Sequence, residues 1–485
     1  MGLAEGDTRR PDSDGDDRAC QRIETLVDAG SFVATGESGE AGAAGFARID
    51  GRRVCVHADG GPRLAGRTTA GAARRLHALL TAAGRDGTPL IMLLDGSGPR
   101  LDEGGDGLAA WAEVLAATAR LEGRCLRLAV LCGPIGGAGG LLPGLADLVV
   151  SVPGASVHCR DEGPGTSHAP IPGADRTAAR RGGSSFPPLA LTAEPERSSG
   201  SGLELAARDE TQAFAWLRSA LALLARPAEA DPAPAMKLPG EPARSALAAA
   251  TIPEDPNTPW DVRHLVRDLV DEGALLALGD GHDPLFCALA RLEGRAIGVL
   301  ANRAEVRAGV PDLVQLRRAA RFVRLCDQFE LAMISLIDAP ALADENPLAG
   351  AGSVAAAASE LVAALARARV PRLAILLRKG FGAVLLAMAG LPALADRILA
   401  LPGTQLAATL PDQALEWLHG HAIESADDPL ARRDALADEY RLQETAAERA
   451  AERGLVDTIV PLDGLRQALR DGLAMLDRQR RRDSD

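Results

Sequence analysis

A small-residue stretch that follows an apolar run is the strongest candidate for a reactive site in this sequence. Residues 128–131 are apolar and predict a buried strand, which the Gly-Pro pair at 133–134 ends. Gly136, Gly137 and Ala138 follow, and glycine lets a main chain approach a ligand closely. Because the first N–H groups of a helix have no partner inside it, this stretch could present backbone donors to an oxyanion or a phosphate. A tight turn before a buried helix is the alternative interpretation.

Several parts of the sequence occur twice in the chain. Several blocks recur 243 positions later, and one recurs 249 positions later, so six residues were gained in between. One register held over separate blocks indicates the duplication of a whole domain rather than a short repeat. The recurrences at 243 are Asp28 as Asp271, Ala47 as Ala290 and Asp95 as Asp338, and the recurrence at 249 is Asp147 as Asp396. The counterpart of the Gly137 stretch is residues 378–384, so two oxyanion pockets are predicted.

Length and composition narrow the class of protein. The 485 residues suit two domains, and an apolar content of 47% is enough for large cores. Strands that alternate with helices predict an α/β fold. The net charge of −13 argues against nucleic acid as a partner. Seven cysteines without a Cys-x-x-Cys pair fit a reducing cytoplasm and predict no metal site.

Neither a signal peptide nor a membrane span is expected. The first 17 residues are polar and acidic. The uncharged stretch 128–146 contains two prolines and many glycines, which argues against a transmembrane helix. A cytoplasmic location is therefore predicted.

The pattern predicts the following division of the chain. Residues 1–21 form a disordered N-terminus, 22–225 a first domain, 226–250 a linker, 251–477 a second domain, and 478–485 a frayed tail. Residues 154–202, rich in Gly, Pro and Ser, are expected to form a long surface excursion. The predicted elements are a hairpin at 45–58, helices at 70–83, 108–121, 314–327, 355–367 and 431–451, an apolar helix start at 141–146, and strands at 90–94, 331–337 and 373–377.

Side chains that could act as nucleophiles or metal ligands do not form a recognisable constellation. Ser97 lies in Gly-Ser-Gly rather than in a Gly-x-Ser-x-Gly elbow. The histidines are scattered without metal spacing. The positive signals are backbone ones, which suits thioester enolate chemistry. Removal of a proton or a carboxylate next to a thioester puts charge on its carbonyl oxygen, where two N–H donors can stabilise it.

Several stretches carry a resemblance to a known family. Residues 95–104 read Asp-Gly-Ser-Gly-Pro-Arg-Leu-Asp-Glu-Gly, similar to Asp-Ser-Gly-Gly-Ala-Arg-x-Gln-Glu-Gly in that family. Residues 133–150 resemble its first glycine motif and end in Asp-Leu-Val-Val. Further similar stretches are 252–263, 319–327 and 451–457. The sequence thus resembles the biotin-dependent acyl-CoA carboxyltransferases, the beta subunits of propionyl-, acetyl- and related acyl-CoA carboxylases.

This resemblance implies a fold and an assembly. The fold would be two tandem crotonase-like (ClpP/crotonase) domains related by internal duplication. Such chains usually form a homo-hexamer of two stacked trimers. Acyl-CoA would lie on the first domain of one subunit and carboxybiotin on the second domain of a neighbour. The biotin itself would be carried by a separate subunit that works with a biotin carboxylase.

The resemblance also implies site residues. The first oxyanion hole would fall on the N–H groups of Gly137 and Ala138, beside Gly136. The second would fall on those of Ala383 and Val384, beside Gly382. Leu386 stands near the position that tunes acyl-chain choice in the family. No metal is implied.

Three functions remain open from the sequence. The first is a carboxyltransferase subunit that moves a carboxyl group from carboxybiotin to the alpha carbon of an acyl thioester through an enolate. The second is a biotin-independent decarboxylase of malonyl-type thioesters, and the third is a non-catalytic paralogue subunit of a carboxylase complex. The second and third arise because the family's Gly-Gly-Ala-Tyr is replaced here by Gly-Ala-Val-Leu at 382–385. The side chains of Ala383 and Val384 are expected to narrow the biotin pocket and to weaken the use of free biotin.

Overall fold

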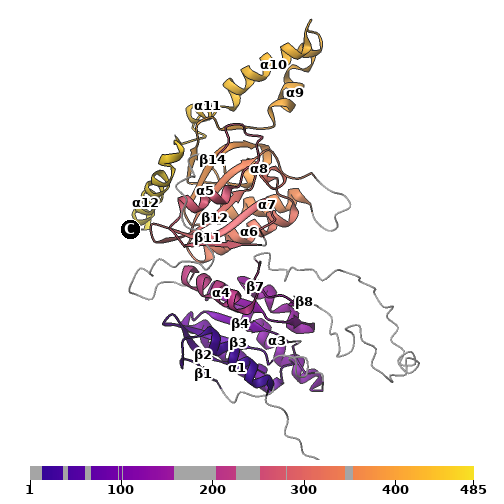
Figure 1. The fold of residues 1–485 in the computed structure, drawn as a ribbon, viewed down its shortest axis with the longest axis vertical. Coiled ribbons are helices and arrows are strands. Elements are labelled where there is room, and N and C mark those ends of the chain that lie inside the picture. Colours follow the sequence, from indigo (N-terminus) through magenta and orange to yellow (C-terminus); the bar gives the residue numbers. More distant parts are fainter. Residues whose placement is uncertain are drawn as a thin grey trace, which may run out of the picture. The chain divides into compact units, whose positions relative to one another are not determined.

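The computed structural model describes residues 14–35, 42–60, 67–96, 98–100, 102–157, 204–224, 252–279, 281–344 and 353–484. The chain forms two compact units, residues 1–218 and 219–485, and the division falls within helix α4 (Glu210–Leu224) (Figure 1). Each unit is an α/β structure, which confirms the predicted fold class.

The first unit is built on a seven-stranded sheet with the order β1-β2-β3-β4-β5-β7-β9. Strands β1 to β3 are antiparallel neighbours, and β3 to β9 run parallel along that order. The strands are β1 (Val33–Ala34), β2 (Ala43–Ile49), β3 (Arg52–Ala58), β4 (Leu90–Leu94), β5 (Arg127–Leu131), β7 (Leu148–Ser151) and β9 (Glu204–Ala206). The helices are α1 (Asp14–Leu26), α2 (Ala70–Asp86), α3 (Gly104–Arg120) and α4.

The second unit repeats this topology. Its sheet has the order β10-β11-β12-β13-β14-β15-β17, again with two antiparallel pairings followed by four parallel ones, and β16 pairs with β14 off this path. The strands are β10 (Leu275–Leu278), β11 (Leu285–Leu292), β12 (Arg295–Asn302), β13 (Ala332–Ala339), β14 (Arg372–Phe381), β15 (Arg397–Ala400), β16 (Gln405–Ala407) and β17 (Thr458–Ile459). The helices are α5 (Val262–Leu269), α6 (Leu313–Gln328), α7 (Val354–Arg367), α8 (Gly382–Ala387), α9 (Pro411–Glu424), α10 (Pro429–Tyr440), α11 (Ala447–Glu452) and α12 (Leu465–Ser484).

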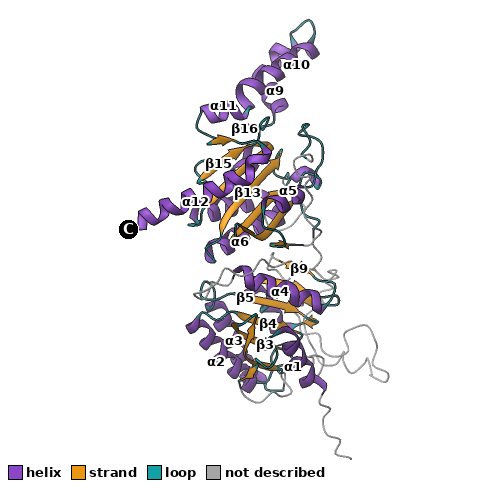
Figure 2. Cartoon of the chain, turned by 60° about the vertical axis from the view of Figure 1, so that its left-hand side comes forward, coloured by secondary structure: helices purple, strands orange, loops and turns teal. Residues whose placement is uncertain are grey.

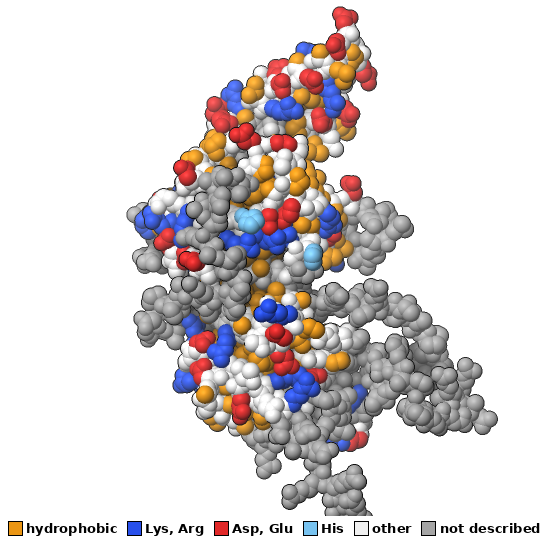
Figure 3. Space-filling model, in the orientation of Figure 1, with side chains coloured by type: hydrophobic (Ala, Val, Ile, Leu, Met, Phe, Trp, Pro, Cys, Tyr) orange, Lys and Arg blue, Asp and Glu red, His pale blue; other side chains and the backbone are white. Residues whose placement is uncertain are grey.

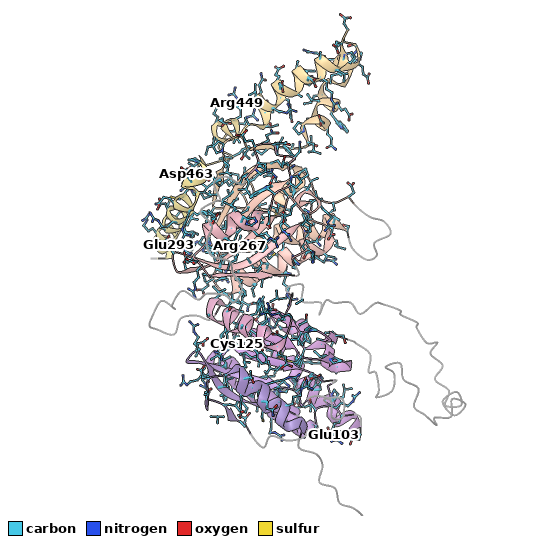
Figure 4. The ribbon with its side chains drawn as sticks, viewed as in Figure 1. Glu103, Cys125, Arg267, Glu293, Arg449 and Asp463 are labelled. Atoms are coloured by element: carbon cyan, nitrogen blue, oxygen red, sulfur yellow. The ribbon has the colours of Figure 1, made fainter. Side chains whose placement is uncertain are left out.

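The repeated aspartates explain why the same turn forms twice. The Asp28 carboxylate accepts hydrogen bonds from the N–H groups of Asp50 and Gly51 at 3.0 and 2.8 Å, in the turn between β2 and β3. Asp271 binds the equivalent N–H groups of residues 293 and 294, in the turn where Figure 4 labels Glu293. Both residues of each turn have positive φ, which two-residue hairpins of this type require. The predicted duplication is therefore confirmed in the backbone as well as in the sequence.

Helices cover both faces of each sheet. In the first unit, alternate residues of β4 and β5 pack with α2 and α3 in one apolar core. In the second unit, alternate residues of β12, β13 and β14 pack with α5 and α12. Figure 2 shows these helices flanking the strands of the second unit. Alternation of this kind follows from the two-residue repeat of a strand, which places successive side chains on opposite faces.

A helical arm extends from the second unit. Helices α9 and α10 pack against each other through Leu415, Leu436 and Ala437, and both stand off the sheet (Figures 1 and 2). Charged side chains of both signs lie along the visible face of this arm, with apolar ones between them (Figure 3).

Most predicted elements are present with ends shifted by a few residues, but both chain ends differ from the prediction. Helix α1 begins at Asp14, so the predicted disorder of residues 1–21 is wrong from that residue onward. Its buried residues Ala19, Ile23 and Leu26 recur at helical spacing within a polar composition. The predicted frayed tail 478–485 is wrong up to Ser484, because α12 continues to that residue. The excursion beyond residue 157 and the linker at 226–250 lie outside the described residues.

Three internal predictions also need correction. The predicted helix 431–451 is α10, a π-helical turn η6 (Arg441–Thr445) and α11, because the backbone is extended at Ala446, which bridges Gln405. The strand predicted at 373–377 continues to Phe381, since β16 extends the pairing. The predicted helix start at 141–146 is two short 3-10 turns, η2 (Gly137–Leu141) and η3 (Pro143–Leu145).

Candidate active site

The predicted oxyanion residues lie beyond the carboxyl ends of the parallel strands. In the first unit, β5 ends at Leu131, and η2 begins six residues later at Gly137. In the second unit, β14 ends at Phe381, and α8 begins at Gly382. Ligands of open parallel sheets bind at this edge, because the loops that follow the strands gather there.

The two helix starts share one backbone geometry. Gly137 and Gly382 are the first residues of their helices, and their φ angles are 52° and 58°. The residue before each of them is extended, with φ of −128° at Gly136 and −125° at Phe381. A positive φ strains any residue with a side chain, so glycine suits both positions. The first N–H groups of each helix have no partner within it.

Because Gly137 and Gly382 occupy equivalent positions, the two predicted pairs of N–H donors differ by one position along their helices. Gly137 and Ala138 are the first and second residues of η2, whereas Ala383 and Val384 are the second and third residues of α8. Ala138 and Ala383 therefore occupy the same position and belong to either choice of donor pair.

The side chain of Val384 does not stand in the approach to the second helix start. Val384 is fully buried in the core, while Ala383 and Leu386 are exposed. The expectation that both side chains narrow the pocket is wrong for Val384, since only the methyl group of Ala383 faces outward. Local sequence could not show this, because the core side of a short helix is decided by what packs on it.

A carboxylate lies at the carboxyl end of the neighbouring strand in each unit, and in the first unit it is Asp95, whose side chain is 11% exposed. Its Oδ2 accepts a hydrogen bond from Arg22 Nη1 at 2.9 Å, and its N–H donates to Asp59 Oδ2 at 2.9 Å. Arg22 also donates to Glu210 Oε1 on α4 at 2.8 Å. A β-carbon at position 133 would lie 2.1 Å from Asp95 Oδ1, so Gly133 makes room for the carboxylate.

In the second unit the equivalent carboxylate is Asp338, and its partners differ. Arg378 donates to Asp338 Oδ2 through Nη2 and Nε at 2.7 and 2.9 Å, and Trp260 Nε1 donates to the same oxygen at 2.7 Å. Both charged side chains are buried. Arg378 Nη1 also donates to the carbonyls of Asp255 and Thr258 at 3.0 and 2.8 Å, so this pair fixes the segment that enters the second unit.

Lys379 secures the same entry segment from the next position of β14. Its Nζ donates to the Pro256 carbonyl at 2.6 Å. Burial lowers the pKa of Lys379 from its ordinary value. The Arg-Lys pair that precedes Gly382 thus anchors the segment 255–258 to β14.

Charged side chains of the motif at 95–104 make structural contacts. Arg100 pairs with Asp102, with Nη2 and Oδ2 2.6 Å apart. Glu103, labelled in Figure 4 beside the start of α3, accepts a hydrogen bond from the Ala70 N–H at the start of α2 at 2.6 Å. Ser97 lies outside the described residues.

A buried pair near the first site was not anticipated from the sequence. His57 Nε2 and Asp59 Oδ1 are 3.0 Å apart at the carboxyl end of β3, and both side chains are buried. Their i, i+2 spacing at the end of a predicted strand was the available signal, since both side chains then point to one face. Asp59 links this pair to Asp95.

Metal and membrane roles find no support within the described ranges. No group of three or more His, Cys, Asp or Glu side chains there is arranged to hold a metal ion. No helix there has both the length and the apolar character to cross a bilayer.

Comparison with known proteins identifies the family. The family model described as carboxyl transferase domain matches residues 11–484. The chain belongs to the carboxyl transferase domain family. The resemblance expected from the sequence motifs is thereby confirmed, and the protein is a carboxyltransferase by family.

The relatives of this carboxyltransferase include both carboxylases and a decarboxylase. The chain is 29% identical to the propionyl-CoA carboxylase beta chain of Saccharopolyspora erythraea, over 94% of this chain and 87% of that one. It is 25% identical to the methylmalonyl-CoA decarboxylase subunit alpha of Propionigenium modestum, over 90% of this chain and 82% of that one.

A solved structure agrees with the fold. The transcarboxylase 12S structure, a hexamer with methylmalonyl-coenzyme A bound, superposes with a TM-score of 0.79 at 25% identity, over 94% of this chain and 88% of that one. The crotonase-like fold expected from the resemblance is confirmed for this carboxyltransferase.

Proposed function

We propose that this chain is the carboxyltransferase subunit of a biotin-dependent acyl-CoA carboxylase. The observation that carries the proposal is the duplicated helix start, in which Gly137 and Gly382 bend the backbone in the same way at the same edge of two equivalent sheets. In this reaction the acyl thioester becomes an enolate and carboxybiotin loses its carboxyl group. Both changes put negative charge on a carbonyl oxygen, which N–H donors can stabilise. The two helix starts are proposed to supply one such place for each.

The acyl thioester is assigned to the first unit. The alpha proton would pass to the biotin nitrogen that has released CO2, which leaves negative charge on the thioester oxygen, and the N–H groups of Gly137 and Ala138 are proposed to stabilise this charge. The enolate carbon then bonds to CO2. Backbone donors suit this task because their orientation is fixed before the charge develops.

The biotin ring is assigned to the second unit, at the N–H groups of Ala383 and Val384 beside Gly382. The residues next to the proposed donors leave room for a flat ring, since Val384 faces the core and Ala383 adds only a methyl group, while Leu386 is exposed one turn further along α8. Carboxybiotin, when bound, supplies the CO2. A separate carrier subunit is proposed to bring it, charged by a biotin carboxylase.

We infer that the active form is a homo-hexamer. The transcarboxylase 12S relative is a hexamer, and its similarity covers 94% of this chain. In the proposed assembly the acyl-CoA site of one subunit meets the biotin site of a neighbour.

A decarboxylase of malonyl-type thioesters is the second candidate. It is favoured by the similarity to the methylmalonyl-CoA decarboxylase subunit of Propionigenium modestum. It would use the first unit alone, because loss of CO2 from a malonyl thioester also leaves an enolate.

The experiment combines the purified chain with a biotin carboxylase, a biotinylated carrier, ATP, bicarbonate and a series of acyl-CoA esters. Mass spectrometry of the carboxylated thioester is expected to show product only in the complete mixture. In parallel, malonyl-CoA and methylmalonyl-CoA are incubated with the chain alone. Decarboxylation there, without carboxylation in the complete mixture, would favour the second candidate. Absence of both reactions and of acyl-CoA binding would leave a non-catalytic subunit.

A further inference from the structure

Two leucines are exposed at equivalent places beside the two proposed sites. Leu141 on η2 is 51% exposed and Leu386 on α8 is 45% exposed. Each is four residues after the glycine with positive φ, Gly137 in one unit and Gly382 in the other. Isolated exposed leucines are ordinary on protein surfaces. An exposed leucine at the equivalent position of both copies of a duplicated domain, however, indicates a shared role.

The residues between them have matching burial as well. Ala138 and Leu141 are separated by two buried residues and followed by a third. Ala383 and Leu386 show the same pattern in the second unit. Residues three apart lie on one side of a helical turn, and in a 3-10 helix they are nearly eclipsed. Leu141 therefore shares its open side with Ala138, whose N–H is proposed to bind the thioester oxygen.

Side-chain direction brings the leucine closer to that N–H. The bond from Cα to Cβ in a helix tilts toward the N-terminus, so a side chain covers the turn before its own Cα. For Leu141 this is the turn that contains Gly137 and Ala138. An acyl chain whose carbonyl oxygen is held at these N–H groups would run alongside the isobutyl group.

We propose that Leu141 determines which acyl chain length the enzyme accepts, as an apolar wall for short saturated acyl thioesters. This inference rests on the proposed function and deepens it. The resemblance draws attention to Leu386 for acyl-chain choice, whereas the duplication assigns a matching residue in the unit that holds the thioester itself. Contact with an acyl chain would also remove Leu141 from water, which stabilises the complex.

The test compares kcat/KM for acetyl-, propionyl-, butyryl- and hexanoyl-CoA in the complete carboxylation mixture. Leu141→Ala is expected to raise the butyryl-to-propionyl ratio by about tenfold, the usual discrimination for one methylene in an apolar pocket. Leu141→Phe is expected to lower that ratio. Leu108→Ala is the matched control, since Leu108 is 58% exposed on α3, and it should leave the ratio unchanged.

The outcomes separate this inference from the function on which it rests. An unchanged ratio in both Leu141 variants, with wild-type carboxylation intact, overturns the role of Leu141 alone. If the wild-type chain carboxylates no acyl-CoA, the proposed function fails, and the dissociation constants of the same four esters then decide the matter. A changed ratio of the butyryl-CoA to the propionyl-CoA dissociation constant in the Leu141→Ala variant supports the role of Leu141 as an apolar wall. Equal binding of all four esters, or no binding, overturns it.

Discussion

At the scale of single residues, the two copies of one carboxylate show how duplicated positions diverge. Gly133 and Arg378 each lie four residues before the bending glycine of their unit. In the first unit this position must be small, because Asp95 Oδ1 would lie 2.1 Å from any β-carbon there. In the second unit it carries the guanidinium that binds Asp338. In both units an arginine pairs with the carboxylate, but this arginine is Arg22 on α1 in the first unit and Arg378 on β14 in the second.

Proline at the shared donor position should reveal the oxyanion hole. Ala138→Pro removes one N–H yet suits the first turn of a helix, where proline is tolerated. We expect kcat to fall by roughly 10²–10³. Ala138→Gly keeps the N–H and should remain within a small factor of the wild type. The same pair of changes at Ala383 is expected to act on the biotin half-reaction.

Steady-state kinetics of the carboxylation reaction, with circular dichroism to verify folding, is the measurement. Full activity in a folded Ala138→Pro variant would show that other N–H groups form the first oxyanion hole.

Cys132, beside the first site, is expected to be chemically inert. Burial raises the pKa of its thiol to about 12. Since a group with a raised pKa stays protonated at pH values below it, the Cys132 thiol remains protonated at pH 8, and the thiolate is the reactive form. Iodoacetamide at pH 8 should therefore label Cys132 in the unfolded chain but not in the native one, as read by peptide mass spectrometry. Rapid native labelling with loss of activity would contradict this.

At the scale of elements, the buried pair of Asp338 and Arg378 joins β13 to β14 and to the chain entering the second unit. Removing one partner leaves a buried charge without compensation. Asp338→Ala is therefore expected to lower the free energy of unfolding by about 3–5 kcal/mol. The double variant Asp338→Leu with Arg378→Met should recover part of this loss, because it removes both charges.

Urea unfolding followed by tryptophan fluorescence measures this change. Asp102→Ala is the matched control, because Asp102 pairs with Arg100 at the surface and water replaces the lost partner. Equal effects of the Asp338 and Asp102 changes would show that burial is not what makes the Asp338 pair important.

At the scale of the whole molecule, the helical arm carries apolar side chains that its own packing does not cover. Trp417 is 89% exposed on α9, and Leu418 and Leu430 are exposed on the same hairpin. Exposed apolar groups that cluster mark surfaces for association. Since a hexameric relative is similar over 94% of the chain, we expect a second copy of this chain to cover them.

Light scattering at micromolar concentration should give a hexamer for the wild type. Trp417→Glu is expected to lower the molar mass, because an ionised carboxylate is costly to bury in an apolar contact. Leu108→Glu, on α3, is the control and should leave the hexamer intact. A monomeric wild type would exclude a site shared between subunits. A hexameric Trp417→Glu variant would show that Trp417 does not lie in a subunit contact.

The architecture of this protein could be predicted from the sequence alone, because the information for it is local and repeated. The offset of 243 between Asp28 and Asp271 and between Asp95 and Asp338 revealed the duplication. Strand and helix patterns have short periods that survive in any tertiary context. The positive φ at Gly137 was not predicted, because glycine-rich backbone accepts many conformations and the sequence left a tight turn open.

Only the tertiary structure decided which side chains face the site. Val384 proved to belong to the core and Leu141 to the open side, although both are apolar residues in apolar stretches. Arg378 is buried because Asp338 lies opposite it, and Ala446 interrupts a predicted helix because Gln405 bridges it. In each case the deciding partner is distant in the sequence, and a residue's environment depends on what packs against it rather than on its neighbours along the chain.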